Sequence, residues 1–132
     1  MNIILFDYDS SHDPSAPFVE IEINGYDPQK GTRTLWAMVD SGADATMIPL
    51  RTLKSIGAQY QERRFMSGVT SERTSVNIYN VSIKILPNGY LAGGVKVVAR
   101  PDSNEALVGR DVLNQLEITL NGPGESIIIR ND

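Results

Sequence analysis

The 132-residue sequence contains no cysteine and a single histidine, and both absences exclude kinds of chemistry. Without cysteine the chain can form neither a disulfide nor a catalytic thiolate. The one histidine, His12, lies in the polar segment 9–14, where no apolar framework holds a general base. A Ser-His-Asp hydrolase is therefore not expected, and neither is a histidine-rich zinc site. Among hydrolytic mechanisms, catalysis by carboxylates is the one that these absences leave open.

The sequence also lacks a long hydrophobic run, a basic leader and an excess of positive charge. No apolar run approaches the length of a membrane span. The start, Met1–Asp7, has neither a basic n-region nor a small-residue cleavage site, so we expect no signal peptide and a cytoplasmic location. A formal net charge of −4 argues against nucleic acid as the main partner, and the one basic doublet, Arg63-Arg64, is interpreted as a solvated strand end.

Three acidic residues near the N-terminus, Asp7, Asp9 and Asp13, are spaced somewhat like the ligands of a calcium loop. The segment has His12 where such a loop needs glycine and Phe18 where it needs glutamate. We therefore interpret 7–17 as a polar loop or arm, and we expect neither a metal nor a cofactor. With 41% hydrophobic and 21% charged residues, the chain has the composition of one globular domain over residues 1–132.

Apolar and polar residues alternate along most of the chain, and this period of two predicts strands. The expected strands are 19–23, 34–39, 76–78, 81–86, 95–99, 106–108, 118–120 and 126–130. The phase slips at Tyr79-Asn80, which predicts a bulge, and Pro87-Asn88-Gly89 predicts a hairpin. Two short helices are expected, over 51–56 and over 110–116. Many short strands separated by turns indicate an all-β fold, a small closed barrel or a sandwich.

The most informative segment begins with the apolar run 35–39, which delivers Asp40 directly into Ser41-Gly42. A carboxylate at the end of a buried strand is presented on a tight turn, where Gly42 permits close backbone approach and Ser41 can fix the loop by hydrogen bonds. An ordinary Asp-Ser-Gly surface turn is the alternative interpretation, since these residues are common in turns. The apolar run before the turn favours a catalytic acid.

A second segment, 106–120, places an apolar strand before Gly109 and a short helix after it. Arg110 stands at the start of that helix, where a cation opposes the helix dipole. A nearby carboxylate, Asp44 or Asp111, would explain this placement through a guanidinium pair. An ordinary strand–helix corner with an exposed arginine is the other interpretation.

Together the two segments resemble the retropepsins, the retroviral-type aspartic proteases with cellular and bacterial relatives. The resemblance rests on the segment 39–44, Val-Asp-Ser-Gly-Ala-Asp, followed about sixty residues later by the segment 107–113, Leu-Val-Gly-Arg-Asp-Val-Leu. It covers roughly residues 18–130, and it implies a small closed acid-protease barrel with one short C-terminal helix. It also implies an active twofold homodimer.

The resemblance assigns roles to residues at the matched positions. Asp40 would be the catalytic aspartate, with Ser41 and Gly42 forming its loop, and Asp44 would pair with Arg110 to brace that loop. Segment 65–71 lies where the family places its flap, a hairpin that closes over bound peptide; a simple surface hairpin is the alternative. The residues implied to contact substrate are Ala43, Asp44, Ser67, Gly68 and Val69.

Aspartic proteases use two carboxylates around one water molecule, whereas this chain has a single Asp-[Ser/Thr]-Gly turn. One subunit would then offer half a site, and a homodimer acting on peptide would complete it. In the family the chain termini build much of the dimer sheet. Segment 127–129, Ile-Ile-Ile, fits a strand buried by a partner or one buried in its own barrel. A dimer that binds peptide, or scaffolds a partner, without turnover is the second hypothesis.

Overall fold

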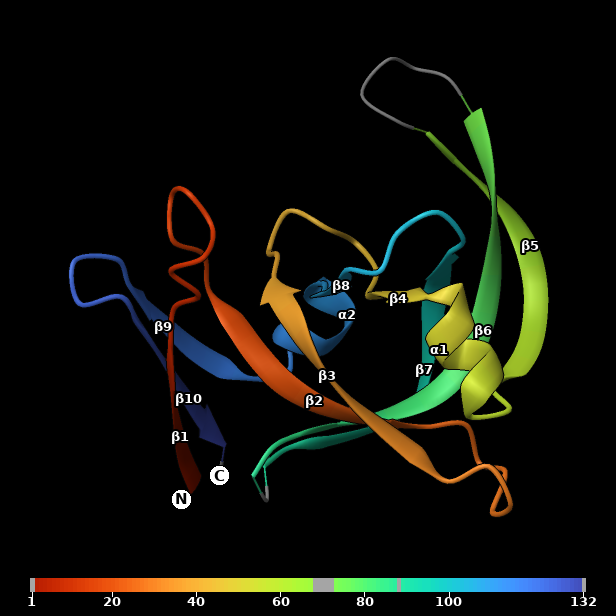
Figure 1. Cartoon of the computed structure of the whole chain (residues 1–132), viewed down its shortest axis with the longest axis horizontal. Helices are drawn as coiled ribbons and strands as arrows, with labels where there is room; N and C mark the ends of the chain where they lie inside the picture. The colour runs from red at the N-terminus through yellow and green to blue at the C-terminus, as the bar shows by residue number, and fades with distance from the viewer. Residues whose placement is uncertain (1, 68–72, 88, 132) are drawn as a thin grey trace.

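The computed structural model describes residues 2–67, 73–87 and 89–131 (Figure 1). Within these ranges the chain forms ten strands and two short helices. The strands are β1 (Asn2–Asp7), β2 (Phe18–Asn24), β3 (Thr32–Val39), β4 (Met47–Pro49), β5 (Gln59–Ser67), β6 (Arg73–Ile85), β7 (Leu91–Arg100), β8 (Ala106–Val108), β9 (Glu117–Asn121) and β10 (Ser126–Asn131). The helices are α1 (Leu50–Ser55) and α2 (Arg110–Leu113).

Six of these strands close into a barrel. They follow the order β2-β3-β8-β4-β7-β6, and an antiparallel pairing between β6 and β2 joins the two ends. The fifth strand in sequence, β5, extends this sheet outward as the partner of β6. The predicted all-β class and closed barrel are confirmed.

The barrel interior is filled by the apolar residues of alternating strands. In β2 the side chains of Val19, Ile21 and Ile23 are buried, while the residues between them are only half-buried. The same alternation runs through Val81, Ile83 and Ile85 of β6. This interior holds β3 and β8 in place, and these two strands lead into the turn at Asp40 and the helix at Arg110.

The predicted phase slip occurs within β6. Both Ile78 and Val81 are buried although they are three residues apart, so the strand changes phase between them. The pairing of β5 with β6 shifts between Tyr60 and Glu62, opposite Tyr79 and Ile78, and the pairing of β6 with β7 shifts after Val81. The bulges let one 13-residue strand serve both the barrel and the hairpin with β5.

Both predicted helices are present, but the second is shorter than expected. Helix α1 ends before Gly57, which has a φ of +62°. Helix α2 ends at Leu113, whereas the sequence predicted a helix to Leu116. After Leu113 the backbone N–H groups of Gln115 and Leu116 donate to carbonyls three residues back, so the chain continues as tight turns. No helix in the described residues is long and apolar enough to cross a bilayer.

A separate three-stranded antiparallel sheet lies beside the barrel, in the order β1-β10-β9. Strand β1 was not predicted from the sequence. It pairs with β10 from Asn2 opposite Asn131 to Asp7 opposite Ser126, which brings the two ends of the chain side by side (Figure 1). Ile127 and Ile129 of β10 are fully buried by the chain's own residues, while Ile128 on the other face is half-buried.

Candidate active site

Asp40 follows β3 at the point where this strand runs parallel to β8. The register places Val39 beside Val108, and the Asp40 N–H donates to the Val108 carbonyl at 3.0 Å. Ala37 and Val39 are buried and anchor the strand, whereas Trp36 is more than half exposed and meets Phe6 of β1 edge to face. Asp40 itself is half-buried at the strand end, so its carboxylate keeps contact with solvent.

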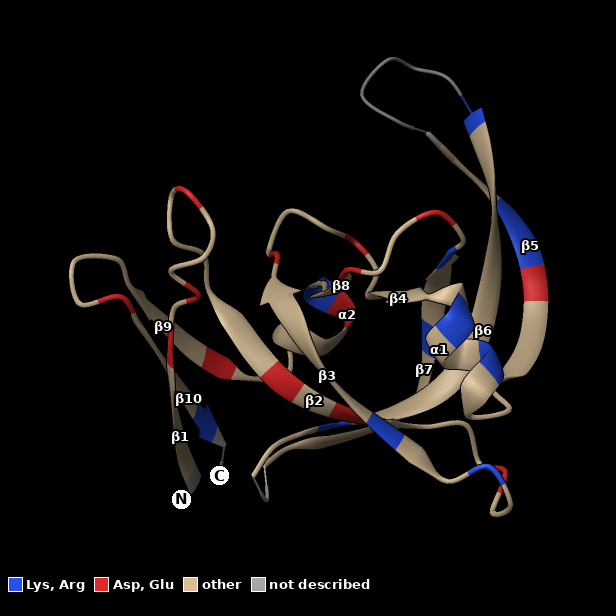
Figure 2. Ribbon diagram, viewed as in Figure 1, with Lys and Arg blue, Asp and Glu red and all other residues tan. Residues whose placement is uncertain are grey.

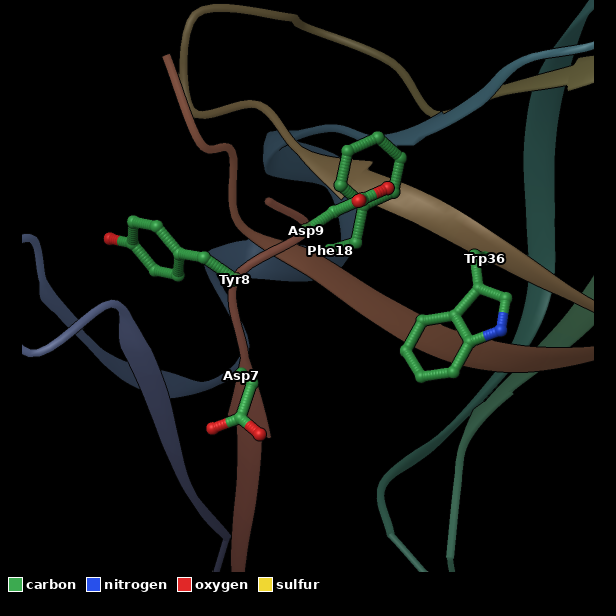
Figure 3. A pocket seen from close by; sticks show the side chains of 5 residues that line it. All are labelled: Asp7, Tyr8, Asp9, Phe18 and Trp36. Atoms are coloured by element: carbon green, nitrogen blue, oxygen red, sulfur yellow. The ribbon is translucent and has the colours of Figure 1, made fainter. Parts of the chain in front are cut away.

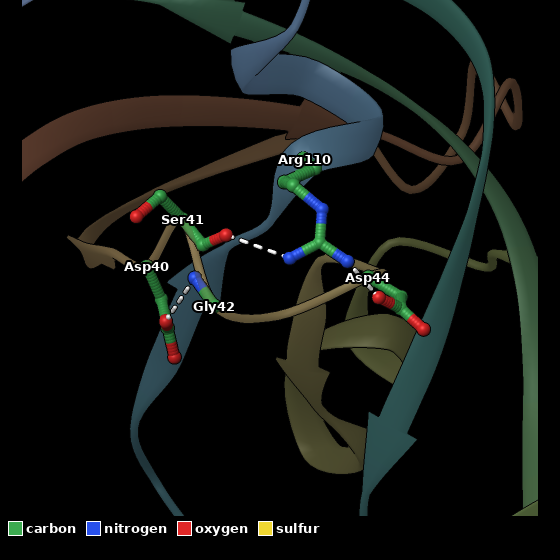
Figure 4. A network of polar contacts seen from close by, with 5 residues as sticks. All are labelled: Asp40, Ser41, Gly42, Asp44 and Arg110. Carbon is green, nitrogen blue, oxygen red and sulfur yellow. Dashed lines mark hydrogen bonds and ion pairs between the residues drawn. The ribbon is translucent and has the colours of Figure 1, made fainter.

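The turn after Asp40 is organised by the carboxylate itself. The Gly42 N–H donates to Asp40 Oδ1 at 3.0 Å, and the Ala43 N–H donates to the Asp40 carbonyl at 3.2 Å (Figure 4). A Cβ on Gly42 would stand 3.2 Å from Asp40 Oδ1, tighter than an ordinary contact. The glycine thus lets the backbone approach the carboxylate and leaves the second oxygen, Oδ2, directed away from the turn.

Arg110 connects the start of α2 to this turn. Its Nη1 donates to the Ser41 carbonyl at 2.7 Å, and its Nη2 forms an ion pair with the Asp44 carboxylate (Figure 4). Of the two carboxylates that the sequence offered, Asp44 is therefore the partner. Because the side chains of Arg110 and Asp44 are 41% and 80% exposed, the ion pair is solvent-screened. The bond to Ser41 is the contact that holds the Asp40 turn directly.

Asp111 has a different role, which the sequence analysis missed. Its carboxylate accepts the Thr46 N–H at 2.9 Å and the Thr46 hydroxyl at 2.7 Å. The Thr46 Oγ1 in turn accepts the Gly109 N–H at 3.1 Å. Thr46 is the one fully buried polar side chain among the described residues, and a buried hydroxyl needs such partners. A threonine between the apolar residues Ala45 and Met47 was the available signal.

Gly109 allows the two segments to pack against each other. A Cβ at this position would lie 2.7 Å from the backbone carbon and oxygen of Ala45 and 2.9 Å from the Ala43 carbonyl. The neighbouring Arg110 N–H donates to that same Ala43 carbonyl at 2.9 Å. Backbone meets backbone here, so the glycine fixes the distance between α2 and the Asp40 turn.

The residues predicted to contact substrate are only partly described. Ala43 is half-buried and Asp44 is exposed in the loop after Asp40, while Ser67 ends β5. Gly68 and Val69 lie outside the described residues. Strands β5 and β6 form a long hairpin that projects from the barrel, and the flap role of its tip stays a prediction (Figure 1).

Residues 59–65 of β5 and 73–75 of β6 are exposed and carry charges of both signs (Figure 2). Arg64 pairs with Glu62 on β5, and the Arg73 guanidinium of β6 lies 5.0 Å from the centre of the Phe65 ring. The basic doublet 63–64 is therefore part of a mixed, solvated strand.

A hollow lies away from Asp40, between the N-terminal segment and the barrel (Figure 3). It has a volume of about 260 Å³ and is lined by Asp7, Tyr8, Asp9, Phe18 and Trp36. The Ser11 hydroxyl and N–H donate to the Asp9 carboxylate, and these bonds lower the pKa of Asp9. Among the described residues, no group of three acidic or histidine side chains is arranged to hold a metal ion.

The geometry of the Asp40 turn, with Arg110 braced against it, agrees with a comparison of the sequence with known families. Residues 13–121 match the family described as retroviral aspartyl protease. The chain belongs to this family. The match includes both Asp40 and Arg110, and it spans the barrel and reaches the end of β9.

A solved retropepsin-like structure has the same fold as this chain. A retropepsin-like aspartic protease from Rickettsia conorii has a TM-score of 0.64 at 14% identity, covering 97% of this chain and 89% of that one. The EIAV protease in complex with the inhibitor HBY-793 has a TM-score of 0.48 at 18% identity, covering 75% of this chain and 86% of that one. No curated protein sequence is significantly similar to the chain.

Proposed function

We propose that this retropepsin-fold chain is a homodimeric aspartic endopeptidase that hydrolyses peptide bonds in extended substrates. The observation that carries the proposal is the burial and hydrogen bonding of the Asp40 side chain. It is half-buried on a glycine turn, with one oxygen bonded to the Gly42 N–H and with its loop fixed through Ser41 by Arg110. A rigid support of this kind is typical of a group that must hold a reacting water in place.

In the proposed reaction, Asp40 and its symmetry mate share one proton around a water molecule. Two carboxylates at short range cannot both ionise comfortably, so the pair holds one proton. The ionised member removes a proton from the water as it attacks the peptide carbonyl, and the protonated member donates a hydrogen bond to the carbonyl oxygen. Proton transfer to the leaving nitrogen then completes the cleavage, and no covalent intermediate forms.

The second Asp40 must come from a second chain. The sequence contains one Asp-Ser-Gly turn; Asp9-Ser10 is followed by Ser11, and Asp102-Ser103 by Asn104. A twofold axis beside the turn brings two identical carboxylates together in an isologous arrangement. The proposal therefore includes a homodimer with one shared site.

Cleavage of an unfolded protein by the wild type and by Asp40→Asn, at several pH values from acidic to neutral, tests the proposal. Asparagine keeps the shape of the side chain and its acceptor oxygen but cannot act as a base. We expect cleavage to be fastest at acidic to mildly acidic pH and to fall by roughly a factor of 100 or more in the variant. Equal cleavage by both proteins would end the proposal. Peptide binding by both proteins, with cleavage by neither, would favour the binding hypothesis.

A further inference from the structure

The hollow beside the N-terminal segment lies on the outer face of β2 and β3. The alternation along these strands buries Val19 and Ala37 in the barrel and turns Phe18 and Trp36 outward, where both line the hollow. Trp36 precedes Asp40 by four residues, so about 13 Å of extended strand separates the two. The hollow is therefore a place on the surface distinct from the Asp40 turn.

Two aromatic rings form part of the lining of this hollow, and one of them is largely uncovered. Trp36 meets the Phe6 ring edge to face, with 5.9 Å between the ring centres, yet it remains 54% exposed. Phe18 packs against the His12 ring, with 4.9 Å between the ring centres. The negative face of an aromatic ring attracts cations, and tryptophan does so more strongly than tyrosine or phenylalanine. The exposed indole of Trp36 is thus suited to contact a positively charged group.

Three carboxylates accompany these rings. Asp7 and Asp9 line the hollow (Figure 3), and Glu20 stands opposite Trp36 in the register of β2 and β3. Over residues 2–67, 73–87 and 89–131, no lysine or arginine forms an ion pair with any of the three. The basic group in contact with them is His12, whose Nδ1 lies 3.4 Å from Asp9 Oδ2. The hollow therefore carries negative charge that no fixed cation of the described chain neutralises.

Asp9 is kept ionised and in a fixed orientation by its own loop. The Ser11 N–H and hydroxyl donate to Asp9 Oδ1 at 2.9 Å and 2.6 Å, and these bonds hold the pKa of the carboxyl below its usual range. Both bonds use the same oxygen, so Oδ2 can still accept from a charged donor. The carboxylate thus keeps its charge at mildly acidic pH as well as at neutral pH.

We propose that this hollow binds an arginine side chain of a peptide, with the guanidinium against the Trp36 ring and its charge matched by Asp7 and Asp9. A guanidinium is planar, so it can stack on an aromatic ring and pair with carboxylates at the same time, which an ammonium cannot do as well. The volume of about 260 Å³ is below the roughly 300–1,000 Å³ of pockets for drug-sized ligands and suits one long side chain. Free arginine is a poorer ligand, because its own carboxylate would meet only negative charge. The inference does not depend on the proposed function.

Trp36 is the single tryptophan of the chain, so its fluorescence reports directly on the hollow. The probe is the capped peptide acetyl-Gly-Arg-Gly-amide, and its control contains citrulline, which has nearly the shape of arginine but no charge. The titration uses Asp40→Asn, so that the peptide is not cleaved and the Asp40 carboxylate does not attract it. We expect the arginine peptide to change the Trp36 emission and to bind about tenfold more tightly than the citrulline peptide. Equal binding of the two peptides, or binding of neither, would overturn the inference.

Variants of the acidic residues locate the charge that binds the peptide. Asp9→Asn keeps an acceptor oxygen for the Ser11 bonds and removes the charge, and Asp7→Asn removes the other charge in the lining. Asp13→Asn is the matched control, because Asp13 is an exposed acid of the same segment that does not line the hollow. We expect each lining variant to weaken binding of the arginine peptide by about threefold and the control to leave it nearly unchanged. Equal losses in all three would assign the binding to net charge and contradict the inference.

A second pair of variants, measured by calorimetry, tests the aromatic contact. Trp36→Leu removes the indole, and Tyr60→Leu is its control, since Tyr60 is 51% exposed and meets Tyr79 edge to face with 5.6 Å between the ring centres. Both should keep the circular dichroism of the parent protein. We expect Trp36→Leu to weaken binding of the arginine peptide by about tenfold and Tyr60→Leu to preserve it. Undiminished binding in Trp36→Leu would show that the peptide binds elsewhere and would overturn the inference.

Discussion

Asp111 accepts two hydrogen bonds from Thr46, one from its backbone N–H at 2.9 Å and one from its buried hydroxyl at 2.7 Å. The two residues are 65 positions apart in the sequence. Their contact ties the residue before β4 to α2. Together with the bond from Arg110 to Ser41, it connects the Asp40 loop to the short helix at two points.

Removing this contact should destabilise the protein. Asp111→Ala leaves the Thr46 N–H and hydroxyl without their acceptor, and hydrogen bonds to charged groups contribute about 1.5–3 kcal/mol. We expect the free energy of unfolding to fall by about 2 kcal/mol or more. Urea denaturation measures this, at one fixed protein concentration because the proposed dimerisation would add to stability.

The matched control for this prediction is Asp102→Ala, which removes an exposed aspartate in a turn. Its effect should stay within about 0.5 kcal/mol. If the two substitutions have the same effect, the Thr46 contact contributes nothing measurable to the fold.

A methyl group at Gly109 should force the loop after Asp40 away from α2. In Gly109→Ala the added Cβ would lie 2.7 Å from the backbone of Ala45, where no flexible side chain can move aside. We expect a loss of about 1–3 kcal/mol in unfolding free energy, together with slower cleavage. Gly122→Ala is the control, because nothing lies within 4 Å of its added Cβ. Wild-type stability in Gly109→Ala would show that the close approach is not needed.

Arg110 should matter mainly through Ser41 and less through Asp44. Arg110→Ala removes both contacts, whereas Asp44→Ala leaves the 2.7 Å bond to the Ser41 carbonyl. Since the ion pair is exposed, Asp44→Ala should cost less than about 1 kcal/mol of stability. We expect cleavage and dimer stability to fall more in Arg110→Ala than in Asp44→Ala.

The comparison with another arginine makes the prediction specific. Arg100 also donates to a backbone carbonyl, that of Glu105, at 3.0 Å, but it stands at the end of β7 and its bond does not involve the Asp40 turn. Arg100→Ala should affect cleavage and dimer stability less than Arg110→Ala. Comparable losses would mean that the brace on the Asp40 loop has no functional role.

The elements that position the candidate site could be predicted from local sequence alone. The apolar run before Asp40, the glycine after Ser41 and the strand–glycine–arginine order at 106–110 each depend on neighbouring residues. The barrel strands likewise show their period of two, including the slip at Tyr79-Asn80. These features need no knowledge of distant contacts.

Apart from the end of α2, the features that were missed depend on long-range contacts. The sequence alone did not decide whether Arg110 pairs with Asp44 or with Asp111. The structure shows that Asp111 instead accepts hydrogen bonds from Thr46, which is distant in the sequence. Strand β1 shows no clear alternation, and it is a strand because β10 pairs with it. Ile127 and Ile129 are buried in the chain's own hydrophobic core, whereas the sequence left open whether a partner buries them. The cytoplasmic location and the roles of Gly68 and Val69 stay predictions.

The central claim, one active site made by two Asp40 carboxylates, is tested most directly by a mixed dimer. Wild-type and Asp40→Asn chains carrying different tags are co-expressed, and the dimer that contains one of each is isolated through both tags. Its cleavage rate is compared with that of the doubly tagged wild-type dimer. We expect the mixed dimer to lose nearly all activity. A mixed dimer that keeps half of the activity would show that each chain has a complete site of its own, which would contradict it.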